Sequence, residues 1–110
     1  MITCVVNYVI SPAKLDAFEA FARAWMTLVA DHGGVHHGYF LPSEGASDGA
    51  LALFSFESLA AYERYRKAFG VDPAFIAADR IRDESGCVLR FDRSFMRPLL
   101  PVSGRGTAES

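Results

Sequence analysis

The sequence predicts an α+β fold in which two helices cover one face of a four-stranded antiparallel sheet. First, segments with strand and helix character follow one another in the order β-α-β-β-α-β. Second, 110 residues suffice for one hydrophobic core but not for two, so residues 1–100 are expected to form a single domain. Third, apolar residues make up 51% of the chain and charged residues 22%, an ordinary globular composition.

The first segments predict a strand followed by a long helix. ITCVVNYVI (2–10) is rich in β-branched residues and apolar at odd and even positions, as expected for a strand buried on two faces. Ser11 and Pro12 are predicted to be the N-cap and the first residue of a helix. Apolar residues then recur at three- and four-residue spacing, which predicts an amphipathic helix of about five turns that ends at Gly33-Gly34.

Two further strands are predicted in the middle of the chain. VHHGYFL (35–41) and ALALFSF (50–56) have strand composition, and the second of these is again apolar at both parities. The polar, turn-rich segment PSEGASDG (42–49) joins them as a loop.

The last third of the chain predicts helical structure followed by a closing strand. Ser58 is expected to cap a helix that ends at Gly70. Asp72-Pro73 is expected to start a shorter helix with inward-facing apolar residues, namely Phe75, Ile76 and Ile81. CVLRFDRSFM (87–96) is predicted to be the fourth strand, and residues 101–110 a flexible tail.

This order is ferredoxin-like, and it leaves one face of the sheet without helices. The first and third strands are nevertheless apolar at both parities. The uncovered face therefore needs a cover, and the sheet of a second identical chain is the simplest one. The sequence thus predicts a homodimeric α+β barrel with an internal cavity as its natural ligand site.

Charge and cysteine content narrow the classes of partner. The net charge is −2, the pI is about 5.8 and no run of Lys or Arg occurs, so nucleic acid and membrane surfaces are not expected partners.

The N-terminus lacks the cationic lead and cleavage site of a signal peptide, so we expect a cytoplasmic protein. Cys4 and Cys87 would lie at opposite ends of neighbouring antiparallel strands, so they are expected to be buried thiols without an intrachain disulfide.

Several short stretches resemble the NIPSNAP family: Tyr8 before the helix start at Pro12 and Lys14-Leu15, HGG (32–34) before GYF (38–40), LFSFESLAAYERYR (53–66) and RPL (97–99). The resemblance covers roughly residues 1–100 by pattern and order, without a catalytic signature. It implies a dimeric α+β barrel, a fold shared with antibiotic-biosynthesis-type monooxygenases. The chain departs from the family at Val6, where members often carry a polar or basic residue.

His36 and His37 are the candidate catalytic residues. Because they are consecutive on a strand, their side chains should point to opposite faces and cannot bind one metal ion from one chain. No metal-ligand spacing motif is present, so neither a metal site nor a cofactor is expected. The histidine that faces a cavity would suit general-base chemistry, since imidazole titrates near neutral pH. Alternatively, it bonds a backbone carbonyl or lies in the dimer interface.

Five other residues are candidate ligand-binding groups. Tyr8 and Tyr39 offer a ring and a hydroxyl to an amphipathic ligand, unless they belong to the core. Arg90 and Arg93 lie on opposite faces of the last strand, and an arginine in a cavity would bind a carboxylate or a phenolate. Alternatively, the two arginines belong to a solvated strand edge, where their charges discourage unwanted strand pairing. Asn7 would orient a substrate oxygen or anchor the sheet.

Two functional hypotheses remain open at this point. The first is a NIPSNAP-like homodimeric barrel that holds a small amphipathic or aromatic molecule and acts as a cofactor-independent oxygenase or isomerase. The second is a non-catalytic dimeric binding or assembly protein, whose interface accounts for the apolar residues without a substrate. The lining of the cavity distinguishes them, because an enzyme needs polar groups that converge on a void.

Overall fold

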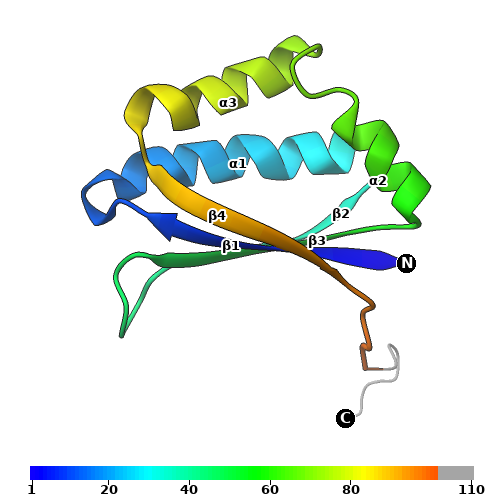
Figure 1. The fold of residues 1–110 in the computed structure, drawn as a ribbon, viewed down its shortest axis with the longest axis horizontal. Helices are drawn as coiled ribbons and strands as arrows, with labels where there is room; N and C mark the ends of the chain where they lie inside the picture. Colours follow the sequence, from blue (N-terminus) through cyan, green and yellow to red (C-terminus); the bar gives the residue numbers. More distant parts are fainter. Residues whose placement is uncertain (102–110) are drawn as a thin grey trace.

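The computed structural model describes residues 1–101 and shows an α+β domain with helices on one face of a single sheet (Figure 1). Its elements are β1 (Ile2–Ile10), α1 (Leu15–Asp31), β2 (Val35–Phe40), β3 (Gly49–Phe56), α2 (Leu59–Arg66), α3 (Pro73–Ser85) and β4 (Val88–Met96). Apart from Pro101, the predicted tail at 101–110 lies outside the described residues. Among the described residues, no helix is long and apolar enough to cross a membrane.

The four strands form one antiparallel sheet in the order β2-β3-β1-β4, as expected for a ferredoxin-like fold. Cys4 pairs with Phe95 near one end of the β1–β4 ladder, and Ile10 pairs with Val88 at the other. Cys4 and Cys87 are therefore far apart, and both are buried free thiols, as predicted.

The start of the first helix differs from the prediction. The Ser11 side chain makes no capping hydrogen bond, and Pro12–Lys14 form a short 3-10 turn before α1 begins at Leu15. The Ser11 carbonyl accepts a hydrogen bond from the Lys14 N–H at 2.9 Å, so its backbone closes this turn.

The two later helices reverse the expected lengths. α2 has 8 residues, whereas α3, predicted to be the shorter helix, has 13. The predicted cap of α2 is confirmed, because the Ser58 hydroxyl accepts a hydrogen bond from the Ala61 N–H at 3.1 Å. Ile76 is 38% exposed rather than inward-facing, because the buried stripe of α3 runs through Phe75 and Ala78, three residues apart.

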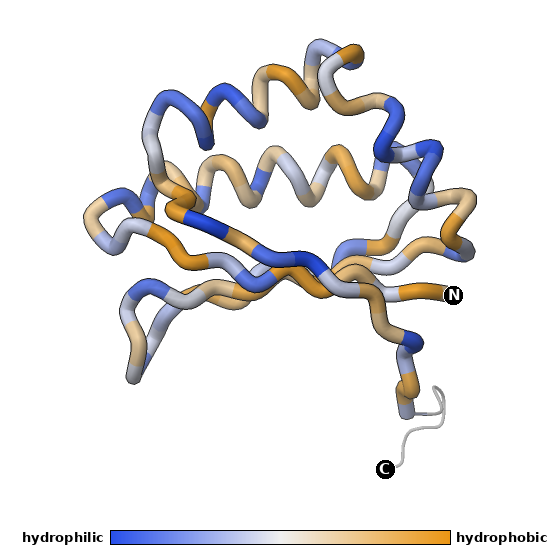
Figure 2. The backbone as a smooth tube through the Cα atoms, in the orientation of Figure 1, coloured by the Kyte–Doolittle hydropathy of each residue, from blue (hydrophilic) through white to orange (hydrophobic). Residues whose placement is uncertain are grey.

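The core lies between the helices and the sheet face that they cover, and it is built largely from aromatic rings. Its largest fully buried side chains include Phe18, Phe56, Tyr65 and Phe75. β4 packs mainly on β1 and is poorly covered by the helices, so Phe91 and Phe95 stay almost half exposed. Polar and apolar residues are interspersed along this strand (Figure 2). Space for a site therefore remains beside β4.

Candidate functional site

The strand register assigns the predicted site residues to two faces of the sheet. We call the face covered by the helices the helix face and the other the open face. Because Tyr8 pairs with Ala50 and Phe91, these side chains share the helix face, and alternate residues along each strand share the open face. The helix face carries Tyr8, His36, Tyr39 and Arg93, whereas the open face carries Asn7, His37 and Arg90.

A β-bulge separates the two histidines. In β2, His36 pairs with Phe54, and Gly38 pairs with Leu53, so His37 is the extra residue. Gly38 has φ +107°, which only glycine adopts readily. His36 therefore packs on Phe54 on the helix face, while His37 bonds to Ser55 on the open face. The two rings diverge as the sequence predicts.

His36 is held as a neutral ring. It stacks on Tyr39 and Phe54 with ring centroids 5.0 and 5.4 Å away, and its Nδ1 accepts a hydrogen bond from the Gly38 N–H at 2.9 Å. Burial, aided by nearby His37, lowers the pKa of His36 to about 4. Its Nε2 is buried without a hydrogen-bond partner among the described residues. Such a ring is a weak base at neutral pH.

His37 belongs to a chain of hydrogen bonds on the open face. Its Nε2 lies 2.8 Å from the Ser55 hydroxyl, which lies 2.7 Å from the Thr3 hydroxyl. Ser55 is only 1% exposed, so its hydroxyl is inaccessible to a substrate in the single chain. These two hydrogen bonds connect β1, β3 and β2. The alternating pattern of the strands did not predict them.

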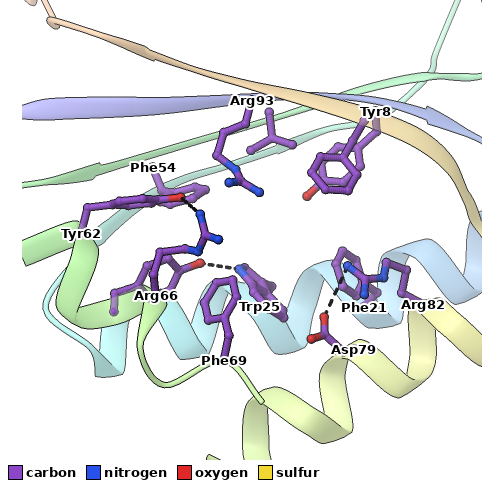
Figure 3. Close-up of a pocket in the computed structure, with 13 residues that line it drawn as sticks. Tyr8, Phe21, Trp25, Phe54, Tyr62, Arg66, Phe69, Asp79, Arg82 and Arg93 are labelled. Carbon is purple, nitrogen blue, oxygen red and sulfur yellow. Dashed lines mark hydrogen bonds and ion pairs between the residues drawn. The ribbon is translucent and has the colours of Figure 1, made fainter. Parts of the chain in front are cut away.

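A cavity of about 200 Å³ lies between the helix face and the helices (Figure 3). Sequence reasoning expected the ligand cavity inside a dimer, whereas this one lies within a single chain. Its apolar and aromatic lining comprises Val6, Tyr8, Phe21, Trp25, Phe54, Tyr62, Tyr65, Phe69 and Phe91. Its charged lining comprises Arg66, Asp79, Arg82 and Arg93.

The floor of the cavity is formed by Trp25 and Tyr65, which share one hydrogen bond. The Trp25 indole N–H donates a hydrogen bond to the Tyr65 hydroxyl at 2.7 Å, and both side chains are buried. Burial raises the pKa of Tyr65, so the hydroxyl stays neutral. The floor therefore presents mainly ring surfaces, because the Trp25 N–H is already bonded.

The charged groups of the cavity are unevenly paired. Arg82 lies 3.5 Å from Asp79 and 3.0 Å from Asp83. Arg66 donates to the Tyr62 hydroxyl at 3.4 Å, and neither Arg66 nor Arg93 has a carboxylate within 4.0 Å among residues 1–101. Two guanidinium groups thus lie beside the cavity without an acidic partner.

Tyr8 places a hydroxyl beside these cations. Its ring packs on Phe18 at 5.1 Å and on Tyr39 at 6.1 Å. Burial raises the pKa of Tyr8, and the nearby Tyr39 hydroxyl, followed by the positive charges of Arg82 and Arg93, partly opposes that rise. The hydroxyl is therefore a neutral hydrogen-bonding group at the cavity.

Only two of the seven predicted site residues line this cavity, namely Tyr8 and Arg93. Tyr39 supports the Tyr8 ring, and its own hydroxyl is buried without a partner among the described residues. His36 packs beside Tyr39, and the remaining candidates, Asn7, His37 and Arg90, lie on the open face.

Sequence reasoning missed Arg66, although the signal was present. Arg66 lies four residues after Tyr62 and three before Phe69, at the spacing of one helix face, and a charged residue at such a position indicates a partner or a cavity. Among residues 1–101, no cluster of three His, Cys, Asp or Glu side chains is placed to hold a metal ion.

Comparison with protein families agrees with the resemblance seen in the sequence. The model of the NIPSNAP family matches residues 5–101, which is nearly the whole chain. A search of the curated proteins found no match.

Solved structures share the fold at low sequence identity. A NIPSNAP family protein with unknown function from Agrobacterium tumefaciens is 17% identical with a TM-score of 0.75, covering 89% of this chain and 87% of that one. An uncharacterized NIPSNAP-like domain protein from Burkholderia xenovorans is 20% identical with a TM-score of 0.70, covering 98% and 90%. A "Putative antibiotic biosynthesis monooxygenase" from Nitrosomonas europaea is 9% identical with a TM-score of 0.69, covering 91% and 100%.

Proposed function

The chain belongs to the NIPSNAP family, and from that premise we propose that it binds a small aromatic or amphipathic molecule in the cavity between its sheet and its helices. The observation that carries this proposal is the lining: ring surfaces form the floor, while Tyr8, Arg66 and Arg93 bring polar groups to one space (Figure 3). A cavity of about 150 Å³ accepts benzene, so this volume suits one ring with a small substituent.

We propose that the open face is covered by a second copy of the chain. Its centre carries the half-buried apolar residues Val5, Val9, Leu51 and Leu53, and its rim carries the more exposed Val35, Phe40 and Met96. A twofold interface brings the same patch of both chains together, and this face holds both Arg90 and Asp92. A homodimer can therefore match opposite charges around an apolar centre.

A catalytic form of the proposal is a cofactor-independent oxygenase or isomerase. Its support is the position of Arg93 beside Tyr8, because a guanidinium there would stabilise a phenolate or enolate formed from the ligand. Neither histidine lines the cavity, so the geometry supports binding more directly than histidine catalysis. Oxygen uptake in the presence of a bound ligand would favour the oxygenase, and a bound ligand that is returned unchanged would favour a binding protein.

Trp25 provides the test of binding, because it is the only tryptophan of the chain and lines the cavity. We expect small aromatic acids, phenols or amides to change its fluorescence and its indole N–H resonance in a saturable way. Val6→Phe should fill the cavity and weaken that response, whereas Val5→Phe changes the open face and should preserve it. If no compound of these classes shifts the Trp25 signals, the binding proposal is wrong.

The dimer and the location are tested separately. Analytical ultracentrifugation should give the mass of two chains, and Leu53→Arg on the open face should give one. A wild-type chain that sediments as a monomer would contradict the dimer. We also propose a cytoplasmic location, in keeping with the free buried thiols Cys4 and Cys87. Fractionation of cells that produce the native protein tests this point.

A further inference from the structure

We propose that the ligand of this cavity is an aromatic carboxylate with a single ring, whose carboxylate is held by Arg66 and Arg93. This inference rests on the proposed binding function and specifies the class of molecule bound. Arg66 comes from α2 and Arg93 from β4, and both guanidinium groups point into the same space (Figure 3).

The charge balance of the cavity favours an anion. Its lining holds three arginines and one carboxylate, and that carboxylate, Asp79, lies beside Arg82. The chain as a whole has more acidic than basic residues, with a net charge of −2. Elsewhere on the helices, Arg23 pairs with Glu19 and Arg80 with Glu84. The two cavity arginines are left for an external anion.

Both arginines are also held by ring faces. The Arg66 guanidinium lies 5.5 Å from the centre of the Phe69 ring, and the Arg93 guanidinium lies 5.7 Å from that of Phe91. A guanidinium that contacts a ring through its face keeps its N–H groups in its own plane, available to a carboxylate. The arrangement is therefore partly organised before a ligand arrives.

The floor determines the rest of the ligand. The Trp25 N–H is already bonded to Tyr65, so the floor offers mainly ring surfaces and few hydrogen bonds to further polar substituents. The volume of about 200 Å³ admits one ring with its carboxylate. A benzoate-like molecule would place its carboxylate at Arg66 and Arg93 and its ring on the aromatic floor. Inorganic phosphate would contact the arginines alone.

The test titrates the full chain with benzoate, with its neutral counterpart benzamide and with inorganic phosphate, and follows the Trp25 fluorescence and indole N–H resonance. We expect benzoate to bind at least tenfold more tightly than benzamide. Added salt should weaken benzoate binding, because the two arginines remain exposed to solvent.

The matched variants separate the site from general charge effects. Arg66→Met and Arg93→Met should each weaken benzoate binding about tenfold or more and leave benzamide binding nearly unchanged. The controls are Arg64→Met on the same helix and Arg97→Met just after the same strand, and both should bind benzoate like the wild type. Circular dichroism confirms that each variant is folded.

The other outcomes distinguish failure of the carboxylate assignment from failure of the proposed binding function. Equal binding of benzoate and benzamide, or loss of benzoate affinity in the control variants, overturns the carboxylate assignment and leaves the proposed function standing. Phosphate that displaces benzoate with comparable affinity identifies a general anion site and also overturns it. If benzoate, benzamide and the wider set of aromatic compounds all leave Trp25 unchanged, both proposals fail.

Discussion

The two faces of the sheet are built from the same strands, but they differ in chemistry. On the helix face, Phe54 and Tyr8 belong to a continuous set of packed rings that ends at the cavity. On the open face, Thr3, Ser55 and His37 hydrogen-bond across three strands beside β-branched and leucine side chains. The comparison teaches that alternate residues of the same strands line a cavity on one face and form a hydroxyl network on the other.

The largest expected effect separates two neighbours on β3. Phe54 is 4% exposed on the helix face, so Phe54→Ala should lower the free energy of unfolding by about 3–5 kcal/mol. Leu53 is half-buried on the open face, so Leu53→Ala should cost the single chain only about 1 kcal/mol and act mainly on dimerisation. Urea unfolding of dilute samples and analytical ultracentrifugation measure the two effects. Equal unfolding losses would contradict the distinction between the faces.

A smaller effect concerns pH and the two histidines. The pKa of His36 falls from 6.5 to about 4 in the folded chain, mainly through burial, so folding favours its neutral form. This stabilisation is complete above pH 6.5 and is lost as the pH falls from 6.5 through 4. We expect a loss of about 2 kcal/mol for this partly buried ring.

Urea midpoints at pH 7, 5 and 4 measure this dependence. His36→Gln should flatten it over this range, whereas His37→Gln on the open face should leave most of it in place. A wild-type chain that keeps its pH 7 stability at pH 4 would rule out the role of His36 in this loss.

The smallest expected effect compares one hydrogen bond on each face. Tyr65→Phe leaves the buried Trp25 N–H without its 2.7 Å partner and should cost about 1–2 kcal/mol. His37→Ala removes one of the two partners of the Ser55 hydroxyl, which keeps its hydrogen bond to Thr3, so it should cost about 0.5–1 kcal/mol. Thermal unfolding measures both. A larger cost for His37→Ala would make the open-face hydrogen bond the stronger of the two.

The order of the strands could be predicted because each strand is a short apolar run between turn residues. The length of α3 was predicted less well, although Gly86, with φ +67°, ends it as a left-handed cap. The face of each site residue could not be assigned, since β1 and β3 are apolar at both parities. That assignment depends on tertiary packing, which also determines the place of Arg66 beside Arg93.

The β-bulge at His37 has a consequence for how the protein avoids self-association through its sheet. β2 and β4 are the two edge strands, and an unprotected edge recruits further strands into aggregates. The bulge interrupts the hydrogen-bonding ladder on β2, while Arg90, Asp92 and Arg93 place charges along β4. Both edges therefore resist fibre-like growth, which favours the broad face of the sheet for the closed assembly that we propose.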